Sequence, residues 1–120
     1  MTNITILRIN LLLKHIDEIL DDTKGITLKE LKESNLLLRA TCFSLAQIGE
    51  QMNKLNELIG EQYPNIPWKE ARKMRNIIVH DYGSTDVEEV YATITNDLEN
   101  LRNSFIVVRY DLQNNEELMK

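Results

Sequence analysis

Apolar residues recur at steps of three and four residues in four segments of the chain. This is the spacing of neighbours on one face of an α-helix, so each segment predicts an amphipathic helix. The first segment covers residues 4–22, and the fourth begins at Thr85 or Asp86, either of which suits an N-cap. The stripes read Ile4, Leu7, Leu11, Leu12, Ile16, Ile19 and Leu20 in the first, and Val87, Val90, Ile94, Leu98, Leu101, Phe105, Val108 and Leu112 in the fourth.

The second segment predicts the longest helix, over residues 28–59. Gly25 favours the left-handed conformation that ends the helix before it, and Thr27 with Glu30 has the spacing of a capping box that starts it. The stripe reads Leu28, Leu31, Asn35, Leu38, Cys42, Leu45, Gly49, Met52, Asn56 and Ile59.

Further apolar residues lie off that stripe and widen the apolar face of the second helix: Leu36, Leu37, Phe43 and Ile48. A second copy of the chain is the simplest cover for such a wide face, with Gly49 allowing close approach between the copies. A central position for this helix, surrounded by its own neighbours, is the alternative.

The third helix is predicted between Trp68 and His80, after a break that contains Pro64 and Pro67. Four glycines and two prolines are too few for a β-sandwich, which needs a turn about every 8 to 12 residues. The sequence therefore predicts an all-α, up-and-down bundle of four or five helices that dimerises. It forms one domain over residues 1–120, with a polar, frayed tail at about 114–120.

Composition excludes several classes of protein. Cys42 is the only cysteine, so the chain has no internal disulfide, and with two distant histidines it lacks the ligand spacing of a zinc site. No metal or other cofactor is expected. Neither a secretory signal nor an apolar run of about 18 residues is present, so the sequence predicts a cytoplasmic protein with no membrane contact. The net charge of −5 also disfavours broad, non-specific nucleic-acid binding.

The third helix departs from this acidic background. This stretch contains only two acids, Glu70 and Asp81, beside four cations: Lys69, Arg72, Lys73 and Arg75. On a helical wheel, one side carries Arg72, Arg75, Asn76 and His80, with Lys73 beside them, while Ala71, Met74, Ile77 and Ile78 form the packed side. A small basic cleft is therefore possible in an acidic protein.

An arginine and a histidine on one helix suit phosphodiester cleavage. Arginine clamps a phosphate and stabilises the charge of the transition state, and histidine moves protons near neutral pH. Such a mechanism needs no metal ion. From spacing alone, the other interpretation is that His80 is a helix cap and Arg75 a solvated charge.

Residues 75–82 read R-N-I-I-V-H-D-Y, which matches R-X4-H-X-Y, the signature of HEPN-domain ribonucleases. The chain resembles in particular the HepT-like toxins of HEPN/MNT toxin–antitoxin pairs. Residues 46–50 resemble the A-x-x-I-G-E segment of that family, and residues 66–68 resemble the I-P-W that opens its motif helix. The resemblance extends from about Ile4 to Phe105.

This resemblance implies a helical dimer in which the motifs of two subunits face one cleft. It implies a metal-independent endoribonuclease with Arg75 and His80 as the catalytic pair, and with Asn76 and Asp81 as polar support. It further implies that a partner nucleotidyltransferase, the MNT antitoxin, transfers AMP to Tyr82. Arg72 and Lys73 are our own prediction for contacts to the RNA backbone, from the helical wheel.

The alternative function is a non-catalytic HEPN module that binds nucleotides or partner proteins and keeps the motif as architecture. Two facing copies of the third helix would form a local positive trench, which answers part of the objection from net charge. The intact motif favours the ribonuclease.

Overall fold

A computed structural model describes residues 2–118, with side chains for residues 4–115. The elements in chain order are α1 (Thr2–Asp22), α2 (Leu28–Glu33), α3 (Asn35–Ile59), α4 (Trp68–His80), a 3₁₀ turn η1 (Tyr82–Ser84), α5 (Val87–Ala92), a π-helical turn η2 (Thr93–Asp97) and α6 (Leu98–Leu118). The described residues contain no strand, so the predicted all-α bundle is confirmed. None of the described helices is long and apolar enough to cross a membrane.

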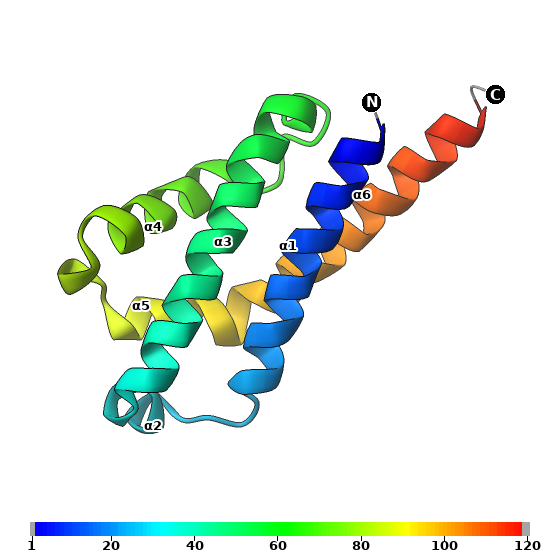
Figure 1. The fold of residues 1–120 in the computed structure, drawn as a ribbon. Helices are drawn as coiled ribbons and strands as arrows, with labels where there is room; N and C mark the ends of the chain where they lie inside the picture. The colour runs from blue at the N-terminus through cyan, green and yellow to red at the C-terminus, as the bar shows by residue number, and fades with distance from the viewer. Residues whose placement is uncertain (1, 119–120) are drawn as a thin grey trace.

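The helices α1, α3 and α6 form the body of the molecule, and α4 packs across the far side of α3 (Figure 1). Their buried faces make the core, in which Phe105, Ile9, Leu12, Ile16, Leu31 and Leu55 are fully buried. Trp68 joins the start of α4 to α6, because its ring packs edge-on against Phe105 at 5.8 Å and its Nε1 donates to the carbonyl of Tyr63 at 3.0 Å. The α4 helix is thus fixed at its beginning and along α3, and its end projects from the body (Figure 1).

The predicted signals at the ends and starts of the helices are confirmed. Gly25 has a φ of 72°, the left-handed conformation expected after a helix. Thr27 and Glu30 form the capping box, each side chain accepting from the backbone N–H of the other. Asp86 caps α5, since its side chain accepts from Glu88 N at 2.9 Å.

The prediction of one continuous helix over residues 28–59 was wrong. The helix breaks at Ser34, which has extended dihedral angles and caps α3 by accepting from Leu37 N at 3.2 Å. The hydroxyl competes with the helix for the backbone N–H groups that follow it. Both pieces bury the same side of the stripe, at Leu31 in α2 and Cys42 in α3, so the apolar periodicity carries no sign of the break.

One further expectation needs correction, and the fraying of the tail stays a prediction. In α1 the predicted stripe is only partly buried: Ile4, Leu7 and Leu11 are 48%, 62% and 42% exposed, while Ile9 and Leu13 lie in the core. At the other end, α6 remains helical to Leu118, past residue 114 where the frayed tail was expected to begin. The last two residues of that tail lie outside the described residues.

Candidate functional site

A close crossing of two helices positions α4. Gly49 of α3 is buried, and a Cβ placed on it would lie 2.5 Å from the Cβ of Arg75 and 3.1 Å from the carbonyl oxygen of Ala71. Only a residue without a side chain fits there. The role that we predicted for Gly49, close approach between two copies, is therefore wrong: this glycine lets α4 approach α3 within one chain.

The Arg75 side chain is held by two partners next to this crossing. Its Nη2 lies 3.0 Å from Oε2 of Glu50, and its Nη1 donates to Oδ1 of Asn76 at 3.0 Å. Glu50 also lies 3.8 Å from the Lys54 ammonium. About a third of each side chain of the Arg75–Glu50 pair is exposed, so the guanidinium is oriented and still reaches solvent.

Sequence reasoning did not identify Glu50 as the partner of Arg75. Glu50 directly follows the glycine of the crossing, in the segment that resembles the family. That adjacency was the available signal, because a long side chain one residue from a crossing can reach the opposite helix.

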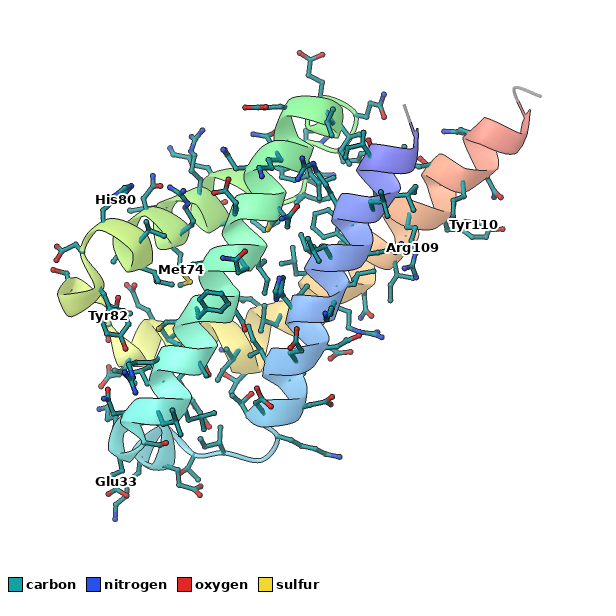
Figure 2. The ribbon with its side chains drawn as sticks, in the orientation of Figure 1. Glu33, Met74, His80, Tyr82, Arg109 and Tyr110 are labelled. Atoms are coloured by element: carbon teal, nitrogen blue, oxygen red, sulfur yellow. The ribbon has the colours of Figure 1, made fainter. Side chains whose placement is uncertain are left out.

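His80 is the last residue of α4, and it is exposed. Figure 2 shows His80 on the outer side of α4, away from the inner side where Met74 lies. His80 follows Arg75 by five positions in the helix, which corresponds to about 7.5 Å along the axis and about 140° around it. In the part of the chain that the structure describes, no hydrogen bond joins the two side chains. One chain therefore holds the pair on one helix but not in contact.

The turn after His80 is closed by Asp81. Its carboxylate accepts from the Ser84 hydroxyl at 2.6 Å, and its carbonyl accepts from Ser84 N at 2.9 Å. Of the two predicted supporting residues, Asn76 thus contacts Arg75, whereas Asp81 shapes the η1 turn that carries Tyr82.

Tyr82 is 39% exposed and lies at the α4 end of the molecule, far from Arg109 and Tyr110 (Figure 2). Partial burial raises the pKa of its phenol, the nearby Cys42 thiol raises it further, and Arg39 lowers it. The hydroxyl is therefore protonated at neutral pH, with a cation of α3 in its surroundings. Cys42 itself is buried, and burial raises the pKa of its thiol to about 11.

The predicted RNA contacts, Arg72 and Lys73, are both exposed on α4, as is Lys69 one turn earlier. Among residues 4–115, none of these three cations takes part in an ion pair or a hydrogen bond. They are available to an anionic ligand, and the contact of Arg72 and Lys73 with RNA stays a prediction.

A separate cavity of about 450 Å³ lies on the inner side of α4, between α3, α4 and α6. Its walls are largely apolar and include Leu45, Met52, Met74 and Leu98, with Glu70 and Asp97 at polar positions. Arg75, His80 and Tyr82 do not line it. No three His, Cys, Asp or Glu side chains converge on a possible metal position in the described part of the chain.

The chain is similar to proteins that are named as ribonucleases. A family model described as "Ribonuclease HepT-like" matches residues 12–108. "Putative RNase MJ1216" of Methanocaldococcus jannaschii is 28% identical over 106 residues, which cover 88% of each chain. "Putative RNase TTE0752" of Caldanaerobacter subterraneus is 28% identical over 75% of this chain and 80% of its own length.

"Probable ribonuclease HepT" of Thermococcus cleftensis is 30% identical over 66 residues, 55% of this chain and 60% of its own. No solved structure matches the chain at a significant level.

Proposed function

Because the chain belongs to the HepT-like ribonuclease family, we propose that it is the toxin of a toxin–antitoxin pair, an endoribonuclease that cleaves RNA without a metal ion. Arg75 and His80 are the catalytic pair of this proposal. The observation that carries it is the Arg75 guanidinium, which is oriented by Glu50 and Asn76 yet open to solvent, on the same helix as an exposed His80.

The chemistry follows from what the two side chains offer. His80 takes the proton of a ribose 2′-hydroxyl, and the oxygen attacks the adjacent phosphorus to give a cyclic phosphate. Arg75 stabilises the charge that develops on the phosphate oxygens. A second acid protonates the departing 5′-oxygen, and the His80 of a second copy is the group that we assign to this step.

A homodimer belongs to the proposal for the same reason. Arg75 and His80 point in directions about 140° apart on one helix, so a cleft shared by two copies is the simplest way for a phosphate to meet both types of side chain. Support comes from apolar side chains exposed on α3 and α4 near the motif: Leu36, Phe43 and Val79 are 74%, 62% and 51% exposed. Their burial between two copies would favour association.

Regulation by a partner completes the proposal. A cognate MNT nucleotidyltransferase, acting in the cytoplasm, transfers AMP to the Tyr82 hydroxyl. Support comes from the exposure of Tyr82, its position two residues after His80, and the influence of Arg39 on its pKa. A phosphate attached there would compete with RNA for the nearby cations.

The test is cleavage of pooled cellular RNA by the purified protein in EDTA. We expect Arg75→Ala and His80→Ala each to lower the rate by at least about 100-fold, with the dimer state unchanged. The unfolding free energy should stay the same in His80→Ala and fall by less than about 1 kcal/mol in Arg75→Ala, which loses the pair with Glu50. Arg102→Ala is the matched control, since that arginine binds Asp17 of α1 rather than any group of α4.

Full cleavage by either variant would contradict the assigned pair, and cleavage that requires Mg²⁺ would contradict the metal-free mechanism. Protein co-expressed with the nucleotidyltransferase should gain the mass of AMP, and Tyr82→Phe should not. If unmodified wild-type protein binds RNA but does not cut it, the non-catalytic HEPN module is the better description.

A further inference from the structure

The outer side of α4 carries a line of polar side chains that continues well beyond the catalytic pair. Lys69, Arg72, Asn76 and His80 follow one another at steps of three and four residues, with Lys73 beside them. This spacing places them on one side of the helix, and all five are exposed. We call them the α4 ridge.

The α4 ridge is free of acidic side chains. The one acid of α4, Glu70, lines the cavity on the inner side of the helix, and Glu50 of α3 binds Arg75 rather than the ridge. None of Lys69, Arg72 and Lys73 has an ion pair among residues 4–115. In a chain with 19 acids and 14 cations, this leaves an unneutralised line of positive charge.

The position of Lys69 is not explained by the stability of the helix. It lies in the first turn of α4, where the helix dipole favours acids and disfavours cations. A cation in that place does not stabilise its own helix through the dipole.

The length of the ridge limits how many phosphates of a nucleic-acid strand it can contact. Lys69 and His80 are eleven residues apart, about 16 Å along the helix axis at 1.5 Å per residue. One strand of a duplex carries a phosphate about every 3.4 Å of axis, and a stretched single strand carries fewer. The ridge therefore faces about three to five phosphates in a row.

We propose that the α4 ridge binds the backbone of single-stranded RNA, and that Lys69 contacts a phosphate several nucleotides away from the bond cleaved at His80. One line of cations matches one backbone, whereas recognition of a double-stranded RNA needs contacts to both strands across the minor groove. This inference rests on the proposed function, and it adds Lys69 and a minimum substrate length to that function.

The test uses synthetic oligonucleotides that contain one ribonucleotide in a DNA strand, so that each has a single cleavable bond. The length on either side of that bond is varied from one nucleotide to about eight, within the range of known single-strand sites. Lys69→Ala is compared with Lys29→Ala, which removes an exposed lysine of α2 that likewise has no ion pair among the described residues.

For the long substrates we expect Lys69→Ala to raise KM about three- to tenfold and to reduce the salt dependence of log KM by about one phosphate contact, with kcat unchanged. For a dinucleotide the same variant should equal the wild type, because no phosphate reaches position 69. Its melting temperature should not fall, since the helix dipole is relieved. Lys29→Ala should behave as wild type throughout.

Two results would overturn the inference: equal kinetics of the Lys69→Ala and Lys29→Ala variants on long substrates, or equal cleavage of single-stranded RNA and the same sequence in a duplex. Either result leaves the proposed function standing if Arg75→Ala and His80→Ala still abolish cleavage. If those two variants cut normally, the proposed function itself fails.

Discussion

Arginines lie on two sides of the molecule in opposite circumstances. Where α1 meets α6, Arg102 binds Asp17 at 2.7 Å and Arg109 donates to Asn10 at 2.7 Å. On the α4 ridge, Arg72 has no such partner among the described residues. The same residue type thus ties two helices together on one side and remains unpaired on the other.

The difference shows how an acidic protein can reserve a place for an anion. An arginine that is bound to a carboxylate or an amide must release that partner before it can bind a phosphate. The contact between the two helices is then lost as well. An unpaired cation has no existing contact to lose when it binds an anion. Arg75 lies between these extremes, since Glu50 orients it while about a third of the side chain stays exposed.

Outside the proposed catalytic pair, the largest effect should come from the crossing that supports the α4 side. Gly49→Ala introduces a Cβ only 2.5 Å from that of Arg75, and overpacking of this kind costs about 1–3 kcal/mol of unfolding free energy. We expect a lower melting temperature and, because Arg75 is displaced, a loss of RNA cleavage of more than about tenfold.

Gly83→Ala is the matched control, because nothing lies within 4 Å of a Cβ at that position. Equal melting of Gly49→Ala and wild type would contradict the tight contact between α3 and α4.

A smaller effect should follow from releasing Arg75. Glu50→Gln keeps the shape of the side chain and removes its charge, so the guanidinium is freer to hold a phosphate. RNA should bind about two- to fivefold more tightly, and the unfolding free energy should fall by less than about 1 kcal/mol because the pair is partly solvated. Binding titrations of the wild type and the variant measure this.

Glu88→Gln provides the comparison, since Glu88 pairs with Lys32 at 3.2 Å on another part of the surface. If both glutamine variants bind RNA alike, Arg75 does not exchange Glu50 for phosphate.

The smallest effect is expected where α1 meets α6. Arg102→Ala breaks the pair with Asp17, and exposed pairs contribute about 0.2–1 kcal/mol. Chemical denaturation should detect this loss, while RNA cleavage stays at the wild-type rate. Weakened cleavage would mean that the RNA also reaches α6, and the contrast between the two sides would no longer hold.

Much of the fold could be predicted because local signals act within one turn of helix. The capping box at Thr27 and the cap at Asp86 needed only residues three or four positions away. The bounds of α4, Trp68 and His80, were predicted correctly from the proline before it and the turn after it. The break at Ser34 was missed because the stripe of apolar residues continues across it.

Tertiary relations were harder to predict. Periodicity identified α1 as a helix but not which of its apolar rows meets the core, so Ile4 and Leu7 were expected inside and lie exposed. The wheel of α4 placed Met74 and Ile78 correctly on the packed side, but it put Arg75 on the open side, whereas the Arg75 Cβ packs at the crossing with Gly49 of α3. The Arg75–Glu50 pair joins residues on two helices, and it depends on a crossing that no local pattern records. The catalytic and supporting roles of the predicted site residues remain predictions.

The π-helical turn at Thr93–Asp97 bears on how this chain is compared with others. Its stripe takes two successive steps of four residues, from Val90 to Ile94 to Leu98, and a wider turn keeps all three buried where the 3.6-residue period would rotate them away. A homologue with an ordinary α-helix between α5 and α6 would connect them with one residue fewer. Sequence alignments with such proteins should therefore need a one-residue gap between α5 and α6, and without it every core position of α6 would be matched to the wrong neighbour.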